Sequence, residues 1–91
     1  MVIIDNKTND AREGFASVMG DDDVTLKAKG LFAYLFSREG EHMTLETVLE
    51  NTSESVSAVR AAVKELEAAG YLTRVRETGG RYASYDWILR M

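Results

Sequence analysis

The sequence predicts an α+β fold in which three helices are followed by a two-stranded β-hairpin. The clearest helical pattern covers residues 56–69, where apolar residues recur at i, i+3, i+4 and i+7: Val59, Ala62, Val63 and Leu66. A shorter helix and a tight turn precede this helix. Residues 71–77 and 82–89 alternate as strands around Gly79-Gly80, a two-residue turn signal. Helix, turn, helix and hairpin in this order predict a winged helix-turn-helix.

Capping residues set the expected helix boundaries. Thr25 is a good N-cap for a first helix over residues 26–37, whose buried stripe is Ala28, Leu31, Phe32 and Leu35. Gly30 inside this helix costs about 1 kcal/mol relative to alanine, so we expect another helix to approach closely there. Thr44 caps the second helix, which turns Leu45, Val48 and Leu49 inward. Residues 51–55 form the turn, Ser53 or Ser55 caps the third helix, and Gly70 ends it.

The N-terminal quarter has a weaker pattern. We expect residues 1–13 to form a flexible arm and residues 14–91 to form the winged helix-turn-helix domain, with an additional strand over residues 14–19. The run Asp21 to Asp23 favours the positive end of the first helix and does not suit a metal site, because adjacent side chains do not converge on one ion. His42-Met43 is expected to form a short strand before the second helix.

The hairpin register follows from the predicted turn. A turn centred on Gly79-Gly80 places Glu77 opposite Tyr82, Arg74 opposite Tyr85 and Leu72 opposite Trp87. One face then carries residues that pack on the helices: Leu72, Tyr85, Trp87 and Leu89. Arg74 and Arg76 extend the same face toward the tip of the wing.

Composition excludes several classes of protein. The 91 residues suit one small domain, which leaves no room for a deep catalytic cleft beside its core, and no nucleophile–base pair is evident. We therefore expect no enzymatic activity, no cofactor and no metal. The chain has no cysteine, no apolar run of the roughly 18 residues that a membrane span needs, and no signal peptide, which favours a cytoplasmic protein.

Charge is the main observation against a nucleic-acid partner, since the net charge is -4. The charge is unevenly distributed along the chain. Residues 1–24 hold six acids and two bases, whereas residues 25–91 hold nine of each. The acidic excess therefore lies in the N-terminal quarter, and the hairpin is mildly basic.

A small, polar and basic stripe lies opposite the apolar stripe of the third helix, and it consists of Ser57, Arg60, Ala61 and Lys64. Such a stripe suits a helix in the major groove of double-stranded DNA. Ser55 at the helix cap is an expected phosphate contact, and Arg74, Arg76 and Arg81 on the wing are expected to contact phosphates or the minor groove. Three structural alternatives stay open: Lys64 lies near Glu67 on a solvated face, Ser57 only caps the helix, or Arg74 stacks on Tyr85.

Three segments resemble the winged-helix domains of phage replisome organisers and plasmid replication initiators. Residues 26–35, LKAKGLFAYL, resemble the opening "S/T-L-K-A-K-G-L-x-A-Y-L" of that group. Residues 58–72, AVRAAVKELEAAGYL, resemble its "A-V-R-x-A-L-K-E-L-E-x-A-G-Y-L", and Tyr85-Asp86-Trp87 resembles the "Y-D-Y/W" of its closing strand. The resemblance covers residues 15–90. It implies binding to double-stranded DNA at a replication origin or an operator, without catalytic residues.

The expected function is therefore double-stranded DNA binding in replication or transcription regulation. The alternative is an acidic winged-helix module that binds another protein and does not bind DNA directly. A homodimer or a further protein partner stays open.

Overall fold

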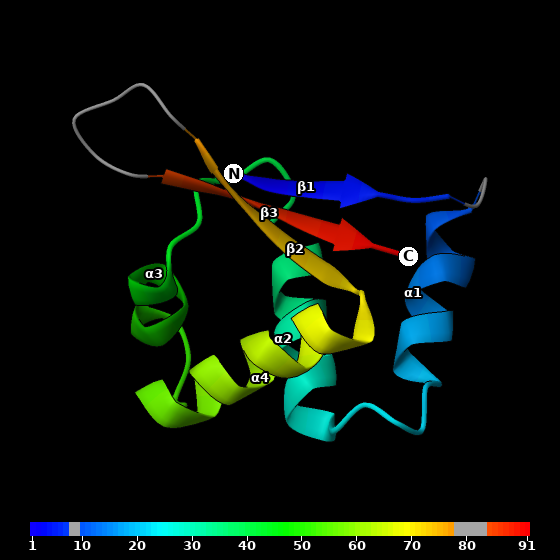
Figure 1. Cartoon of the computed structure of the whole chain (residues 1–91), viewed down its shortest axis with the longest axis horizontal. Helices are drawn as coiled ribbons and strands as arrows, with labels where there is room; N and C mark the ends of the chain where they lie inside the picture. The colour runs from blue at the N-terminus through cyan, green and yellow to red at the C-terminus, as the bar shows by residue number, and fades with distance from the viewer. Residues whose placement is uncertain (8–9, 78–83) are drawn as a thin grey trace.

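The computed structural model describes residues 1–7, 10–77 and 84–91. Within them the chain forms four helices and a mixed three-stranded sheet, which makes it a small α+β domain (Figure 1). In chain order the elements are β1 (Val2–Asp5), α1 (Ala11–Met19), α2 (Leu26–Phe36), α3 (Leu45–Glu50), α4 (Val56–Ala69), β2 (Leu72–Glu77) and β3 (Ser84–Arg90). None of the described helices has the length and apolar character that a membrane span demands.

The sheet has the strand order β1-β3-β2 and lies over the helices as a separate layer (Figure 1). β1 pairs with β3 in parallel, with Val2 beside Trp87, and β2 pairs with β3 antiparallel, with Leu72 beside Leu89. All four helices lie on one side of this sheet, so each strand turns alternate side chains toward them. The N-terminal strand β1 is thus an edge strand, and the C-terminal strand β3 is the central strand beside it.

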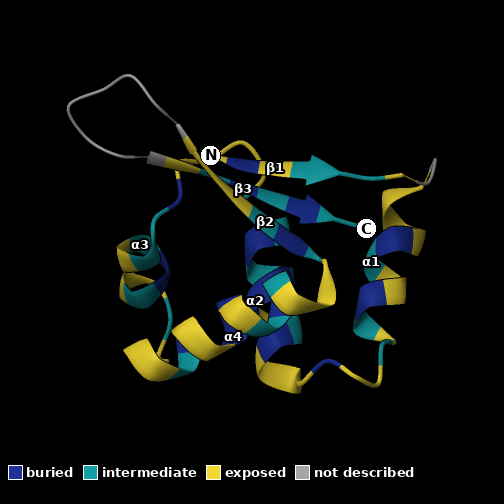
Figure 2. Cartoon of the chain, viewed as in Figure 1, coloured by how far each residue is buried: buried dark blue, intermediate teal, exposed yellow. Residues whose placement is uncertain are grey.

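The core fills the space between the sheet and the helices (Figure 2). Its largest fully buried side chains come from every helix, every strand and the segment before α3, and they are Trp87, Phe32, Leu35, Met43, Leu66, Leu72, Leu89, Val2, Val18 and Val48. The predicted apolar stripe of α4 is confirmed, because Val59, Ala62, Val63 and Leu66 are all buried. The predicted stripe of α2 is confirmed in the same way.

The helix caps confirm most of the predicted boundaries. The hydroxyls of Thr25, Thr44 and Ser55 each accept a hydrogen bond from a backbone N–H in the first turn of α2, α3 and α4. Ser55, and not Ser53, is therefore the cap of α4. Gly70 ends α4 with a φ of 84°, a left-handed conformation that glycine adopts without a steric penalty.

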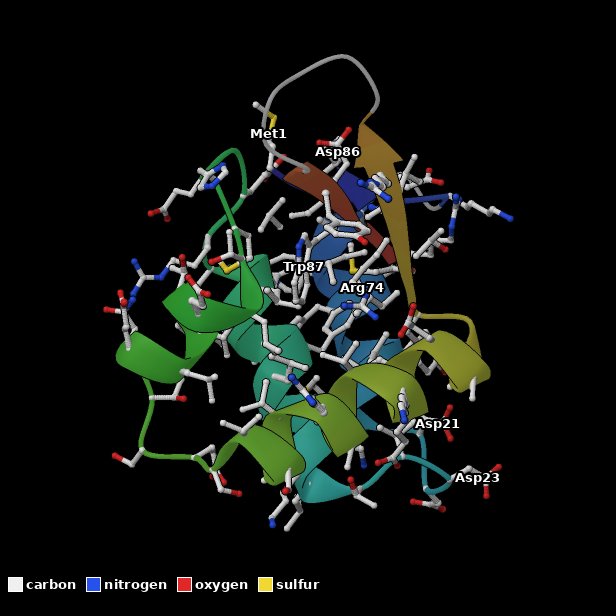
Figure 3. The ribbon with its side chains drawn as sticks, turned by 60° about the vertical axis from the view of Figure 1, so that its left-hand side comes forward. Met1, Asp21, Asp23, Arg74, Asp86 and Trp87 are labelled. Carbon is white, nitrogen blue, oxygen red and sulfur yellow. The ribbon has the colours of Figure 1, made fainter. Side chains whose placement is uncertain are left out.

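The N-terminal quarter differs from the prediction. Residues 1–13 are not a free arm, because β1 is built into the sheet and α1 begins at Ala11. The amino group of Met1 donates to the carbonyl of Tyr85 over 3.1 Å and lies 3.6 Å from Asp86 (Figure 3). At the other end of β1, Asp5 accepts a 2.6 Å bond from Arg90. The expected strand over residues 14–19 is wrong, because Asp10 caps a helix there.

Two further expectations are wrong. His42-Met43 forms no strand; instead the neighbouring Gly40 and Glu41 exchange backbone hydrogen bonds with Val2 over 2.8 and 2.9 Å. The hairpin register is shifted by two residues, so that Arg74 lies opposite Trp87 and not Tyr85. A shift of two keeps every side chain on its predicted face, which is why Leu72, Trp87 and Leu89 are still buried. The predicted Gly79-Gly80 turn lies outside the described residues.

Gly30 is also not explained by a close helix–helix approach. A Cβ atom added at Gly30 would meet nothing within 4 Å. The glycine instead lines an open groove between α2 and α4. The close contact is found at Gly14 of α1, where an added Cβ would lie 2.9 Å from the Cβ of Met91.

Candidate nucleic-acid interface

The packing of α4 fixes the direction of its polar face. Ser55 Oγ accepts a 3.2 Å bond from the N–H of Ala58 at one end, and Gly70 closes the other end. Between them the apolar stripe packs on α2, α3 and β2. The opposite stripe, which we call the α4 stripe, is consequently exposed along its whole length and comprises Ser57, Arg60, Ala61 and Lys64. The sequence prediction for these four positions is confirmed as far as their exposure is concerned.

The two cations of the α4 stripe have no ion-pair partner among the residues that the structure describes. The predicted alternative placed Lys64 near Glu67, but Glu67 accepts a 3.3 Å bond from Arg74. Glu65 faces the other way, and its two carboxylate oxygens accept bonds of 2.7 Å from the N–H and the hydroxyl of Thr25. Glu65 and Glu67 therefore join α4 to α2 and β2, and Arg60 and Lys64 are exposed, as the alternative of a solvated helix face also predicts.

Arg74 on β2 is held within the protein. Besides its bond to Glu67, its guanidinium carbon lies 5.9 Å from the ring centre of Tyr85 and 5.5 Å from that of Trp87 (Figure 3). The alternative in which Arg74 stacks on Tyr85 is thus confirmed, with Trp87 as a second ring. Arg76 is exposed two residues further along β2. Arg81 lies outside the described residues.

An open groove of about 630 Å³ separates α3 and the first turns of α4 from the β2–β3 hairpin. Arg60 and Arg74 both line it, so the groove connects the α4 stripe to the hairpin. The other lining residues are Met43, Thr44, Leu45, Glu46, Leu49, Val56, Tyr85 and Trp87. The indole Nε1 of Trp87 is buried and has no hydrogen-bond partner among the described residues. Of the two guanidinium groups, Arg74 is paired with Glu67, so Arg60 is the one that remains for an anionic ligand, beside the carboxylate of Glu46.

Exposed carboxylates on α3 and in the turn before α4 lie beside the basic α4 stripe. Glu46 and Glu50 are exposed on α3, and Glu54 is exposed in the turn before α4. The acidic run at Asp21 to Asp23 lies near the C-terminal end of α4, because Asp21 is bonded to Tyr71, which follows that helix (Figure 3). The electrostatic field is therefore mixed near α3 and is most favourable to an anion along Arg60 and Lys64.

One carboxylate of the acidic run has a structural partner. The hydroxyl of Tyr71 donates to Asp21 over 2.5 Å. This bond, together with one from the N–H of Asp23, lowers the pKa of the Asp21 carboxyl, and it raises the pKa of the Tyr71 phenol. Asp21 thereby attaches the segment before α2 to the segment after α4.

Sequence reasoning missed two residues of the groove. Tyr85 was expected to pack on the helices, but it lies beyond them and is 41% exposed. Glu46 received no role, although it lines the same groove as Arg60 and Arg74. The strand alternation predicts the face of Tyr85 correctly. Whether the helices cover that part of the face depends on where α3 lies relative to the hairpin.

The described residues contain no group of three or more His, Cys, Asp or Glu side chains that is placed to hold a metal ion. Comparisons with protein-family models, with curated proteins and with solved structures found no match to this chain.

Proposed function

We propose that the protein binds double-stranded DNA, with α4 in the major groove. The observation that carries the proposal is the α4 stripe, an exposed row of small and basic residues on a helix that is capped at both ends and buries its opposite face in the core. Ser57 and Ala61 are small enough for close approach, and Arg60 and Lys64 supply donors for base edges and phosphates. We infer that α3, the turn, α4 and the β2–β3 hairpin act together as a winged helix-turn-helix.

The remaining contacts follow from this placement. A phosphodiester strand beside α4 meets Ser55 at the helix start and Arg76 on β2, and these contacts set the register without reading sequence. Arg74 contributes less than Arg76, because Glu67 and two aromatic rings already engage it. The sequence resemblance favours a role at a replication origin or an operator.

A titration of fluorescent duplexes, first selected from a randomised library, tests the proposal. The double variant Arg60→Ala/Lys64→Ala should lose about 1–3 kcal/mol of binding free energy per base-reading contact. The matched control is Lys7→Ala/Arg12→Ala, which removes the same residue types and the same charge from exposed positions far from α4. Equal affinities of both variants and the wild type would contradict a role for the α4 stripe.

A second function is favoured by the exposed acids of α3 and the turn, Glu46, Glu50 and Glu54. Carboxylates beside the recognition helix repel phosphates, whereas they attract a basic protein surface. If the wild-type chain binds no duplex at low salt, this surface is the interface of a protein-interaction module. The reversal variant Glu46→Lys/Glu50→Lys then weakens binding to the protein partner, whereas it strengthens binding to DNA under the first proposal.

A further inference from the structure

The first turn of α4 exposes two side chains, those of Val56 and Ser57. Val56 is the first residue of the helix and is 47% exposed, although it is apolar. The other two residues of the turn, Ala58 and Val59, face α2, because both line the groove between α2 and α4. The hydroxyl of the capping residue Ser55 already accepts a bond from a backbone N–H. Val56 and Ser57 are therefore the side chains that the start of α4 presents to a ligand.

We propose that Val56 contacts the C5-methyl group of a thymine, so that the DNA site holds a thymine at a fixed position. This inference rests on the proposed function, in which α4 lies in the major groove. The N-terminal residues of a helix in that groove contact base edges. The C5-methyl group of thymine is the apolar group that the base pairs present there. A valine side chain has no hydrogen-bonding group, so thymine is the base whose edge it matches.

Arg60 lies about one turn beyond Val56 on the same side of α4. Residues four apart are neighbours on a helix surface, and both side chains line the groove between α3, α4 and the β2–β3 hairpin. Four residues span about 6 Å along a helix, which matches about two base steps of roughly 3.4 Å when the helix follows the groove. The guanidinium group of Arg60 suits the O6 and N7 acceptors of guanine. The site therefore holds a thymine within about two base pairs of the guanine that Arg60 reads.

The surroundings of Val56 favour an apolar contact and also supply a matched control. Leu45 and Leu49 of α3 line the same groove and are less exposed than Val56, so apolar surface continues beside it. A methyl group placed there loses contact with water. Val75 of β2 is 45% exposed, almost the same as Val56. It turns to the opposite face of its strand from Arg74 and hence away from the groove.

Replacement of thymine by uracil tests the contact, because it removes the C5-methyl group and keeps the hydrogen-bonding groups of the base pair. In a duplex that the wild type selects from a randomised library, each thymine is replaced in turn and the affinity is measured. One replacement should weaken binding by the wild type about fourfold, the value of one buried methyl group. Val56→Ser should bind the thymine and uracil duplexes equally. Val75→Ser should keep the difference of about fourfold.

Each comparison of thymine with uracil is made within one protein, so a change in stability or in overall affinity cancels. A wild type that binds the duplex but responds to no uracil would overturn the contact and leave DNA binding through α4 intact. A Val56→Ser variant that keeps the wild-type response would do the same. A wild type that binds no duplex at low salt would instead remove the proposed function, and the thymine contact with it.

Discussion

Arg74 and Glu67 join the proposed wing to the proposed recognition helix. The Nη2 atom of Arg74 on β2 lies 3.3 Å from Oε1 of Glu67 on α4, and both side chains are about one-third exposed. α4 and β2 are consecutive elements linked only by Gly70 and Tyr71, and this pair is a surface contact between them in addition to the buried side chains of Leu66 and Leu72. Arg74 also lines the groove that contains Arg60.

Replacing Arg74 by alanine should therefore affect folding more than DNA binding. The lost ion pair and the lost contacts with Tyr85 and Trp87 amount to about 1 kcal/mol of unfolding free energy, since solvent screens a pair of this exposure. Arg76→Ala should change stability by less than about 0.5 kcal/mol. Urea denaturation of both variants measures the difference. Equal stability of the two variants would mean that the Arg74 contacts contribute nothing.

The core of α4 should be sensitive to truncation. Leu66 is fully buried at the centre of the apolar stripe. Leu66→Ala should lower the free energy of unfolding by about 2–5 kcal/mol, through lost burial and the cavity that is left. Thermal melting in dilute solution tests this, with Val56→Ala as a control at an exposed position of the same helix. A melting temperature that does not fall would show that Leu66 is not a core residue.

Two glycines should respond in opposite directions to the same substitution. Gly30→Ala should stabilise the single chain by about 0.5–1 kcal/mol, because the new methyl group meets no neighbour and alanine favours the helix. Gly14→Ala should destabilise it, because the methyl group would contact Met91 and Asn6 at 2.9 and 3.1 Å. Urea titrations at low chain concentration compare both with the wild type. A destabilised Gly30→Ala variant would contradict the open space at this position.

The bond between Asp21 and Tyr71 should make stability depend on pH at both extremes. The pKa of Asp21 is lowered in the folded state. Its contribution is present above the unfolded pKa of about 3.9 and is lost as pH falls through the folded pKa. The pKa of Tyr71 is raised, so its contribution is present below about pH 10 and is lost as pH rises through the folded pKa.

Tyr71→Phe removes this bond and leaves the rest of the ring. The stability difference between wild type and variant should be constant near neutral pH and should shrink below about pH 4 and above about pH 10. Denaturation across the pH range measures it. A difference that does not change with pH would assign the effect of the hydroxyl to packing and not to the bond with Asp21.

Local signals predicted α4 and the capped starts of α2 and α3. Ser55, Gly70 and the apolar stripe between them act within one helix, so neighbours in sequence were sufficient. β1 was missed because its three apolar residues, Val2 to Ile4, gain their structure from β3, some 85 residues further along the chain. α1 was missed because Gly14 disfavours a helix and was taken as part of a strand, although Asp10 was a readable N-cap.

The candidate site was predictable only in part for the same reason. The exposure of Arg60 and Lys64 follows from helical periodicity alone. The contacts of Arg74 with Tyr85 and Trp87 depend on the register between β2 and β3. Its bond to Glu67 depends on how β2 lies against α4. The turn predicted at Gly79-Gly80 implies a strand register that is wrong by two residues. Because side chains alternate with a period of two, the wrong register still predicts the same buried face.

The dependence of DNA affinity on salt tests the central claim most directly. If Arg60 and Lys64 contact phosphates of a duplex beside the base edges, each neutralised phosphate releases counterions, so the logarithm of affinity falls with the logarithm of salt concentration by about 0.9 per contact. The Arg60→Ala/Lys64→Ala variant should then show a slope shallower than the wild type by roughly two units. The Lys7→Ala/Arg12→Ala control should keep the wild-type slope. Identical slopes for all three proteins, or a wild type that binds no duplex at low salt, would contradict DNA binding through α4.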